Sequence, residues 1–275
     1  MKSKCPKMRK HLCLPGLLKR TRWSFERIKD TASRKLSIPL ADCLMSGVAM
    51  FGLKYPSLLQ FDKDHRHSTL LKYNLRSLYG INQVPSDTYQ RERLDTVDPY
   101  QLQKTMDRLI AQLQRGKVLE QYRYFKDYCL VSIDGTGYFS SKEIHCDSCC
   151  VKRHSNGTVT YYHQMLAAVM MHPLYKTVFP LMLEPIKKQD GKTKNDCEHN
   201  AAKRLLANLR TSHPHLKIII VLDGLYADGP IIKLLKQLNF PFIITAKEDD
   251  LAYLFELHKV AKKQEIARLN HSKEN

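Results

Sequence analysis

Long hydrophobic runs are absent from this chain of 275 residues. No apolar stretch approaches the roughly 20 residues that a transmembrane helix needs. The N-terminus is also too basic and too broken for a secretory signal. We therefore expect a cytoplasmic protein with no membrane partner.

Acidic residues are scarce relative to basic ones. The chain has 27 Asp and Glu against 45 Lys and Arg, which gives a formal net charge of +18. A surface with this excess attracts polyanions, so we expect nucleic acid as the partner. A basic but inert surface, or a ribosome-associated role, is the alternative interpretation.

A disulfide framework is missing as well. The eight cysteines are scattered along the chain, and several lie in apolar contexts. This usage is typical of reduced thiols in a reducing compartment.

The length allows two units, because domains commonly run about 100 to 200 residues. Residues 1–36 are predicted to be a basic flexible arm, since only Glu26 and Asp30 oppose its many Lys and Arg side chains. An inert solvated tail is the alternative. Residues 37–116 are predicted to be an all-helical DNA-binding region, and its helices are expected at 37–51, 70–79, from Ser86 onward, and at 99–115.

Two arginines in this helical region, Arg91 and Arg93, are candidate phosphate contacts. No helix-turn-helix signature marks a recognition helix among the predicted helices. The assignment therefore rests on charge alone.

From residue 117 the pattern changes to short runs rich in β-branched and aromatic residues. Strands are expected at 130–138, 158–171, 177–183, 218–222 and 242–245, and helices at 196–211 and 230–238. Three strands followed by helix, strand, helix and strand predict a mixed α/β sheet in the ribonuclease-H-like order. We assign residues 117–275 to this domain.

Two Asp-Gly pairs follow buried strands of the predicted sheet. Asp134 follows Cys129 to Ile133, and Asp223 follows Ile218 to Leu222. In the ribonuclease-H-like order these strands are neighbours, so the carboxylates would share a site for Mg²⁺ or Mn²⁺, and a pair of such ions can promote phosphodiester cleavage and transfer. Each following Gly would leave room for a substrate backbone. Either pair by itself reads as an ordinary turn.

A second possible metal site combines cysteines and histidines. Cys146 and Cys149 have the spacing of a zinc knuckle, and His154 and His163, or His145, would supply the other ligands. Free thiols with surface histidines are the alternative. No second Cys pair is present to complete a four-cysteine site.

Several other polar residues lie where they could line the rim of the acidic site. Lys192 and Lys194 would contact phosphate there, although a solvated turn is the simpler interpretation of their loop. Glu184 and Glu198 could also reach the rim. Asp228 is expected to cap the helix that follows it.

Several blocks of the chain together resemble a bacterial insertion-sequence transposase of the DDE type, in the order SIDGTGYFSSKEIHCDSCCVK, YYHQMLAAVMMHP, EPIKKQDGKTKNDCEHNAAKRLL and IIIVLDGLYADGP. LADCLMSGVAMFGLKYPSLLQFD and VPSDTYQRERLD resemble its N-terminal helical region. The resemblance covers about residues 35 to 257 and implies that Asp134 and Asp223 are the first two catalytic acids. It also implies nicking at transposon ends, strand transfer into target DNA, association with the nucleoid, and action as a multimer.

The family also has a third acid, a Glu on a helix after the last core strand, with a Tyr and an Arg before it and a Lys behind it. The late candidates here, Glu256 and Glu265, lack those neighbours. We therefore expect a transposase fragment whose sheet domain is incomplete at its C-terminal end. The alternative function is an inactive, truncated transposase that binds DNA and inhibits an intact copy.

Overall fold

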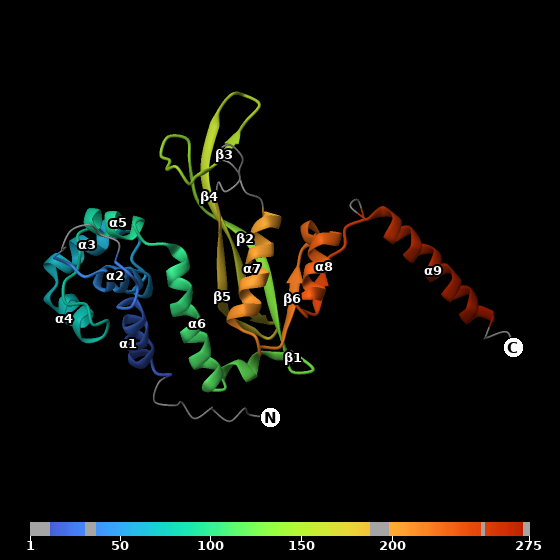
Figure 1. The fold of residues 1–275 in the computed structure, drawn as a ribbon, viewed down its shortest axis with the longest axis horizontal. Coiled ribbons are helices and arrows are strands. Elements are labelled where there is room, and N and C mark those ends of the chain that lie inside the picture. The colour runs from blue at the N-terminus through green and yellow to red at the C-terminus, as the bar shows by residue number, and fades with distance from the viewer. Residues whose placement is uncertain (1–11, 31–36, 188–197, 249–250, 272–275) are drawn as a thin grey trace. The chain divides into compact units, whose positions relative to one another are not determined.

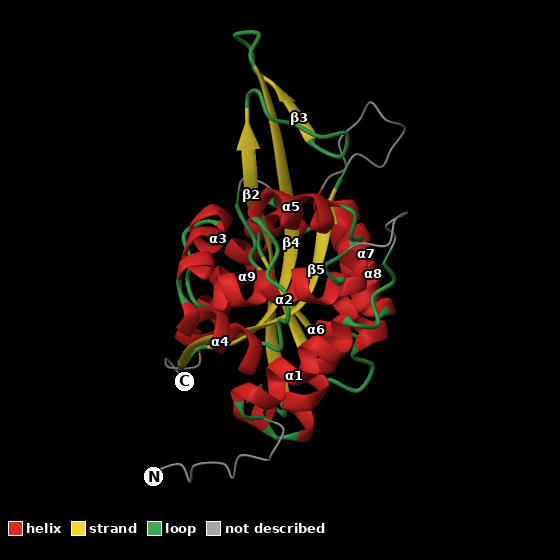
Figure 2. Ribbon diagram, turned by 90° about the vertical axis from the view of Figure 1, so that its left-hand side faces the viewer, coloured by secondary structure: helices red, strands yellow, loops and turns green. Residues whose placement is uncertain are grey.

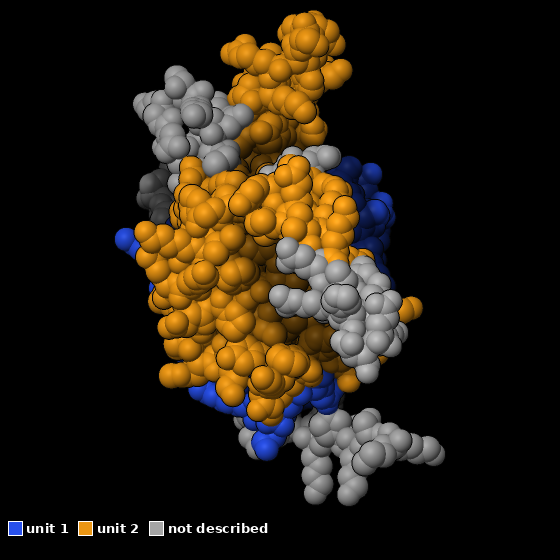
Figure 3. Space-filling view, turned by 90° about the vertical axis from the view of Figure 1, so that its right-hand side faces the viewer, with its two compact units in different colours: residues 1–121 blue, residues 122–275 orange. Residues whose placement is uncertain are grey.

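The computed structural model of the chain describes residues 12–30, 37–187, 198–248 and 251–271. It divides into two compact units, residues 1–121 and 122–275, which Figure 3 shows in different colours. Lys192 and Lys194 lie outside the described residues.

The first unit is helical, and polar caps begin most of its helices. It contains α1 (Leu14–Phe25), α2 (Leu40–Gly52), α3 (Leu58–His67), α4 (Thr69–Ser77), α5 (Asp87–Asp95) and α6 (Pro99–Arg115). The side chains of Ser57, Ser68, Ser86 and Asp98 accept backbone N–H groups in the first turns of α3, α4, α5 and α6. These bonds satisfy donors that a helix start otherwise leaves unpaired.

The prediction of a flexible N-terminal arm is wrong for residues 14–25, which form helix α1. Leu18 and Phe25 of this helix are buried in the same core cluster as Met45, Phe61 and Leu75. The many Lys and Arg residues made the apolar face of this helix hard to recognise in the sequence. Long basic side chains can lie along the outside of a helix while its short apolar stripe packs inward.

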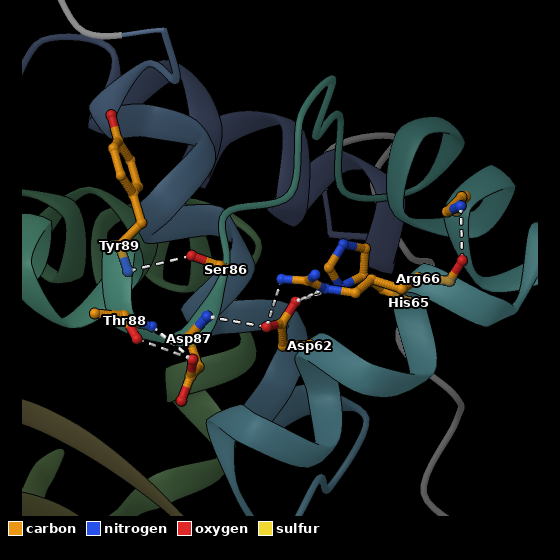
Figure 4. A network of polar contacts seen from close by, with 8 residues as sticks. Asp62, His65, Arg66, Ser86, Asp87, Thr88 and Tyr89 are labelled. Atoms are coloured by element: carbon orange, nitrogen blue, oxygen red, sulfur yellow. Dashed lines mark hydrogen bonds and ion pairs between the residues drawn. The ribbon is translucent and has the colours of Figure 1, made fainter.

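A polar network joins α3 to the start of α5 (Figure 4). The carboxylate of Asp62 accepts hydrogen bonds from Arg66 Nε at 2.7 Å and Nη2 at 3.0 Å, and from the backbone N–H of Asp87 at 3.4 Å. Burial acts to raise the pKa of Asp62, but the bonds from Arg66 and Asp87 outweigh it and the pKa is lowered. The ionised side chain of Asp62 therefore links α3 to the start of α5.

The second unit is a mixed α/β structure built on one open sheet. Its strands are β1 (Arg123–Phe125), β2 (Tyr128–Ser141), β3 (Cys150–Arg153), β4 (Val159–His172), β5 (Tyr175–Ile186), β6 (Ile218–Leu222) and β7 (Phe242–Ile244). Its α-helices are α7 (Glu198–Ser212), α8 (Gly229–Gln237) and α9 (Ala252–His271), and short 3-10 helices η1 (Val118–Tyr122) and η2 (Gly224–Tyr226) precede β1 and α8.

The main strands lie in the order β5, β4, β2, β6, β7. Strands β5, β4 and β2 form an antiparallel meander, whereas β2, β6 and β7 are parallel. Helix α7 packs on β4 and β5 and also contacts α8 (Figure 1). Val131, Leu166, Leu205, Leu209 and Ile220 are fully buried in this core.

Strands β2 and β4 continue past this sheet into a projecting arm, residues 137–165, which also contains β3 (Figures 1 and 2). Within the arm, Cys149 and Cys150 are the buried residues. The arm therefore has almost no apolar core of its own.

No helix in the described part of the chain combines the length and hydrophobicity of a membrane span.

Candidate functional site

The register of the parallel strands places Asp134 and Asp223 at equivalent positions. Strands β2 and β6 pair Ser132 with Val221, and each Asp comes two residues later, Asp134 within β2 and Asp223 just past the end of β6. Both side chains are exposed at this edge of the sheet. The parallel pairing of β2 with β6 makes the two predicted strands neighbours, but β2 continues past Asp134 to Ser141, so Asp134 lies within its strand and not at its end as the sequence predicted.

Each Asp also shapes the backbone that follows it. Asp134 Oδ1 accepts the N–H of Gly135 at 2.8 Å, and Asp223 Oδ1 accepts the N–H of Leu225 at 3.1 Å, which begins η2. These local bonds limit how far the two side chains can turn.

A third carboxylate approaches the edge from α7. Glu198 is the first residue of that helix, and its Oε1 lies 2.9 Å from where a Cβ atom on Gly135 would stand. Any side chain at position 135 would collide with it. The acidic edge is therefore formed by Asp134, Glu198 and Asp223, which come from β2, from the start of α7 and from the end of β6.

Tyr226 lies among these three acids and is only 2% exposed. Its hydroxyl donates to Glu198 Oε2 at 3.4 Å. Burial raises the pKa of Tyr226 first, and the negative charges of Glu198, Asp223 and Asp134 raise it further. The phenol therefore stays protonated and remains a hydrogen-bond donor.

The loop after β6 is tied to the start of α7. His199 Nδ1 lies 3.1 Å from Asp228 Oδ2, and His199 Nε2 lies 2.9 Å from the carbonyl oxygen of Leu225. Asp228 Oδ1 also accepts the N–H of Ile231 at 2.7 Å, which confirms its predicted capping role. These contacts hold Glu198 close to Asp223 in the folded chain.

The predicted space beside the two glycines is occupied by the protein itself. The Glu198 carboxylate covers Gly135, and the Lys247 side chain approaches to within 2.9 Å of a Cβ position on Gly224. The space beside each Gly is thus filled by another side chain of the protein and is not an open channel for a substrate. The carboxylates nevertheless remain exposed enough to meet a ligand.

Glu184 does not lie on the rim of the acidic edge, as the sequence suggested. It is 1% exposed within β5 and pairs with Arg204 Nε at 2.7 Å. A buried carboxylate needs such a partner, so its role is structural. Of the late acids, Glu256 is exposed on α9, and the side chain of Glu265 lies outside the described residues.

The cysteine and histidine group forms a compact cluster at the base of the arm. Cys146 Sγ lies 3.7 Å from Cys149 Sγ, and His163 Nε2 lies 3.3 Å and 3.2 Å from the two sulfur atoms. Burial lowers the pKa of His163 and favours its neutral, metal-binding form. This is a possible Cys/Cys/His metal-binding group.

His154 was wrongly expected in this cluster. Its backbone N–H bonds to the carbonyl of Thr158, five residues before His163 on the same chain segment, and its ring contacts Thr160 Oγ1 at 2.9 Å. Five residues of extended strand span about 16 Å. His145 directly precedes Cys146 in the sequence, but its ring stacks on Tyr161 and its Nδ1 lies 3.0 Å from the carbonyl oxygen of Glu143.

The three-ligand cluster differs from the acidic edge in how tightly its donor atoms converge. Among the described residues, Cys146, Cys149 and His163 form the group whose ligand atoms all lie within 4.8 Å of one another. The three carboxylates do not meet that limit. A cation held by all three carboxylates would therefore need their side chains to rotate toward one another.

In the helical unit, Arg93 is not available for phosphate. Its side chain is 5% exposed and pairs with Asp30 at 2.6 Å. Arg91 remains a candidate, because it is 62% exposed and only loosely paired with Asp87 at 3.9 Å. Sequence alone could not separate the two, since both are arginines on the same short helix.

A basic pocket between α1 and α6 was missed by the sequence reasoning. Its charged lining consists entirely of cations, namely Arg27, Lys29, Lys104 and Arg108. The guanidinium of Arg27 lies 3.4 Å from the centre of the Trp23 ring, and that of Arg108 lies 5.1 Å from it. The pocket depends on α1, which had been predicted as a flexible arm.

Comparison with models of known protein families found no match, and comparison with curated protein sequences found no significant one.

Proposed function

We propose that the chain is a DDE-type transposase that cleaves and joins DNA strands at the acidic edge, in a ribonuclease-H-like domain. The observation that carries this proposal is that Asp134 and Asp223 each come two residues after the paired residues Ser132 and Val221 of two adjacent parallel strands. The strand order, with an antiparallel meander followed by two parallel strands, supports the fold. The family resemblance of the sequence blocks supports the reaction.

The donor set of the edge suits hard divalent cations, because Mg²⁺ and Mn²⁺ prefer carboxylate oxygens. Asp134 and Asp223 would hold the ion, and Glu198 would be their third carboxylate in place of an acid after the last strand. When bound, Mg²⁺ would stabilise charge on the attacking and leaving oxygens. We assign Zn²⁺ to the softer Cys146, Cys149 and His163 group, outside this reaction.

The proposed substrate is double-stranded DNA at transposon ends. In the first step water attacks a backbone phosphorus atom and the 3′ oxygen leaves as a hydroxyl group. In the second step that 3′ hydroxyl attacks a phosphodiester of target DNA and displaces another 3′ oxygen. In this scheme the protein side chains orient the phosphate, and none of them forms a covalent bond to it.

The net charge of +18 supports DNA as the partner. Within the helical unit, the pocket between α1 and α6 offers four cations without an acid in its lining. Arg91 adds an exposed cation on α5. Phosphate contacts of this kind supply affinity and make it depend on salt.

Strand cleavage and transfer test the proposal. The substrate is labelled DNA carrying both ends of the element that encodes the chain, incubated with Mg²⁺. We expect Asp134→Asn and Asp223→Asn each to abolish both reactions. The matched control is Asp127→Asn, which alters an exposed acid beside the opposite end of β2. Activity that persists in both edge variants would refute the proposal.

DNA binding is tested separately from cleavage. The double variant Lys104→Gln, Arg108→Gln should reduce the slope of log affinity against log salt by about 2, since each lost phosphate contact reduces it by about 1. Lys63→Gln, an exposed cation on α3, is the control. An unchanged slope would exclude the pocket as a DNA contact.

The second candidate function is a DNA-binding chain without catalysis, which occupies transposon ends and inhibits an intact copy. The looser spacing of the three carboxylates favours it. Retained, salt-sensitive DNA binding with no cleavage by the wild-type chain would support this function. Association with itself or with an intact copy would then be measured by sedimentation on paired ends.

A further inference from the structure

The projecting arm, residues 137–165, lacks the means to fold on apolar packing. Its two buried residues are Cys149 and Cys150, and the rest of its side chains are partly or fully exposed. The arm is held by its backbone ladder, in which β2 and β3 pair with β4. Small units with so little core usually need a disulfide or a metal ion.

The cluster at the base of the arm has the dimensions of a zinc site. Tetrahedral Zn²⁺ with Zn–S bonds of about 2.3 Å and Zn–N bonds of about 2.0 Å places two sulfurs about 3.8 Å apart and sulfur and nitrogen about 3.5 Å apart. The two sulfurs here are 3.7 Å apart, and the sulfur–nitrogen distances are 3.3 Å and 3.2 Å. The three atoms therefore describe one face of such a tetrahedron.

The local backbone is arranged to hold the two sulfurs. The N–H of Cys146 points to Cys149 Sγ at 3.3 Å, and the N–H of Cys149 donates to the carbonyl of Cys146 at 3.1 Å. A backbone donor to sulfur stabilises the thiolate that a metal requires. Ordinary thiol hydrogen bonds do not explain all three contacts, because each thiol has a single proton to donate and His163 Nε2 can either donate or accept but not both.

The ligands come from two different segments of the arm. Cys146 and Cys149 belong to the loop between β2 and β3, and His163 lies on β4, where its backbone pairs with Phe139 of β2. A bound ion would join the loop to both long strands. The Sγ of the neighbouring residue Cys150 instead points to the carbonyl oxygen of Ile186 on β5, at 3.7 Å.

We propose that Zn²⁺ binds Cys146, Cys149 and His163 and serves as the structural clip that orders the projecting arm. The ion replaces the apolar core that the arm lacks. Its binding free energy then appears as folding free energy of this part of the chain. The sheet below, with its own buried core, folds without it.

Zinc content of the purified full chain is the first test. We expect about one zinc ion per chain by elemental mass spectrometry, and substitution by Co²⁺ should give a thiolate charge-transfer band. Cys146→Ser, Cys149→Ser and His163→Gln should each lose the zinc and the band. Cys150→Ser and His154→Gln are matched controls that should keep both. Equal loss in the Cys150 control, or full retention in His163→Gln, would overturn the assignment.

Hydrogen exchange tests the structural role without any substitution. Removing zinc from the wild-type chain with a chelator should lower amide protection within residues 137–165 at least tenfold, while β6 and α7 keep theirs. Zn²⁺ should restore the protection and Mg²⁺ should not. Protection of the arm that is unchanged by chelation would overturn the proposal, and this outcome does not depend on any DNA reaction.

Discussion

The acidic edge and the arm are consecutive parts of the same strand, yet they are built in opposite ways. Asp134 follows residues of β2 that pack into a fully buried core, including Val131. Three residues later the arm begins, and its buried side chains are cysteines. At the acidic edge, the buried core of the sheet positions the carboxylates. In the arm, which has almost no buried core, metal binding by the side chains would have to stabilise the fold.

This contrast explains the different spacing of the two groups. The carboxylates are placed by strand register and by a helix start, so they can remain apart without a cation and repel one another. The thiols and imidazole converge from one loop and one strand, and the arm that contains them buries only Cys149 and Cys150. An ion at the edge would therefore serve chemistry, and an ion in the arm would serve stability.

The largest expected effect comes from Glu198→Gln. If Glu198 is the third carboxylate, the change should lower strand cleavage by about 1,000-fold, or about 4 kcal/mol in the activation barrier. Hydrogen exchange of the arm should stay unchanged, because the residue lies outside it. Cleavage rates under single-turnover conditions provide the measurement, and Glu256→Gln on α9 is the control. Loss of activity only in the control would return the third acid to the C-terminal helix.

The second effect concerns the core beneath the edge. Arg204→Met should destabilise the second unit by about 3 kcal/mol, because it removes the guanidinium that pairs with the buried carboxylate of Glu184. Urea unfolding followed by circular dichroism measures it. The double variant Arg204→Met, Glu184→Gln should recover most of the loss. A single variant as stable as the wild type would mean that water replaces Arg204.

A smaller effect is expected at Gly135. Gly135→Ala should cost about 1 to 3 kcal/mol, because the new Cβ would overlap the Glu198 carboxylate and force it away. Unfolding and cleavage measured on the same preparation separate the loss of stability from displacement of the acid. Gly157→Ala at the tip of the arm offers a control with nothing within 4 Å, although its φ of 80° adds backbone strain. A Gly135 variant with normal cleavage would separate Glu198 from the reaction.

Much of the secondary structure could be predicted from sequence. The strand 218–222 and the helix 99–115 have the predicted bounds, since an uninterrupted apolar run and a capped amphipathic pattern leave few alternatives. Helix α3 was missed because its sequence LLQFDKDHRH is mostly polar and buries little more than Phe61, Asp62 and His65. Tertiary packing decides such segments, and local periodicity does not show it.

The sites were less predictable than the fold. The two Asp residues could be placed because an uninterrupted apolar run directly precedes each of them, although β2 continues past Asp134 to Ser141. The third carboxylate could not, because only the packing of α7 on the sheet brings Glu198 over Gly135. Likewise the spacing of Cys146 and Cys149 indicated a metal site, but rejecting His154 required the register of the β3–β4 hairpin.

The smallest expected effect is an alkaline one at Tyr226. Its folded pKa is raised, so the tyrosine contributes stability that is fully present below the unfolded pKa of about 10 and is lost as pH rises above that value. Tyr226→Phe cannot ionise, so its stability relative to the wild type should improve steadily between about pH 9 and pH 11. Unfolding midpoints across that range provide the measurement, and Tyr253→Phe, an exposed residue of α9, is the control. A difference that stays constant with pH would mean that neither burial nor the three carboxylates raise the pKa of Tyr226, and the acidic edge would then lose the residue that links its parts.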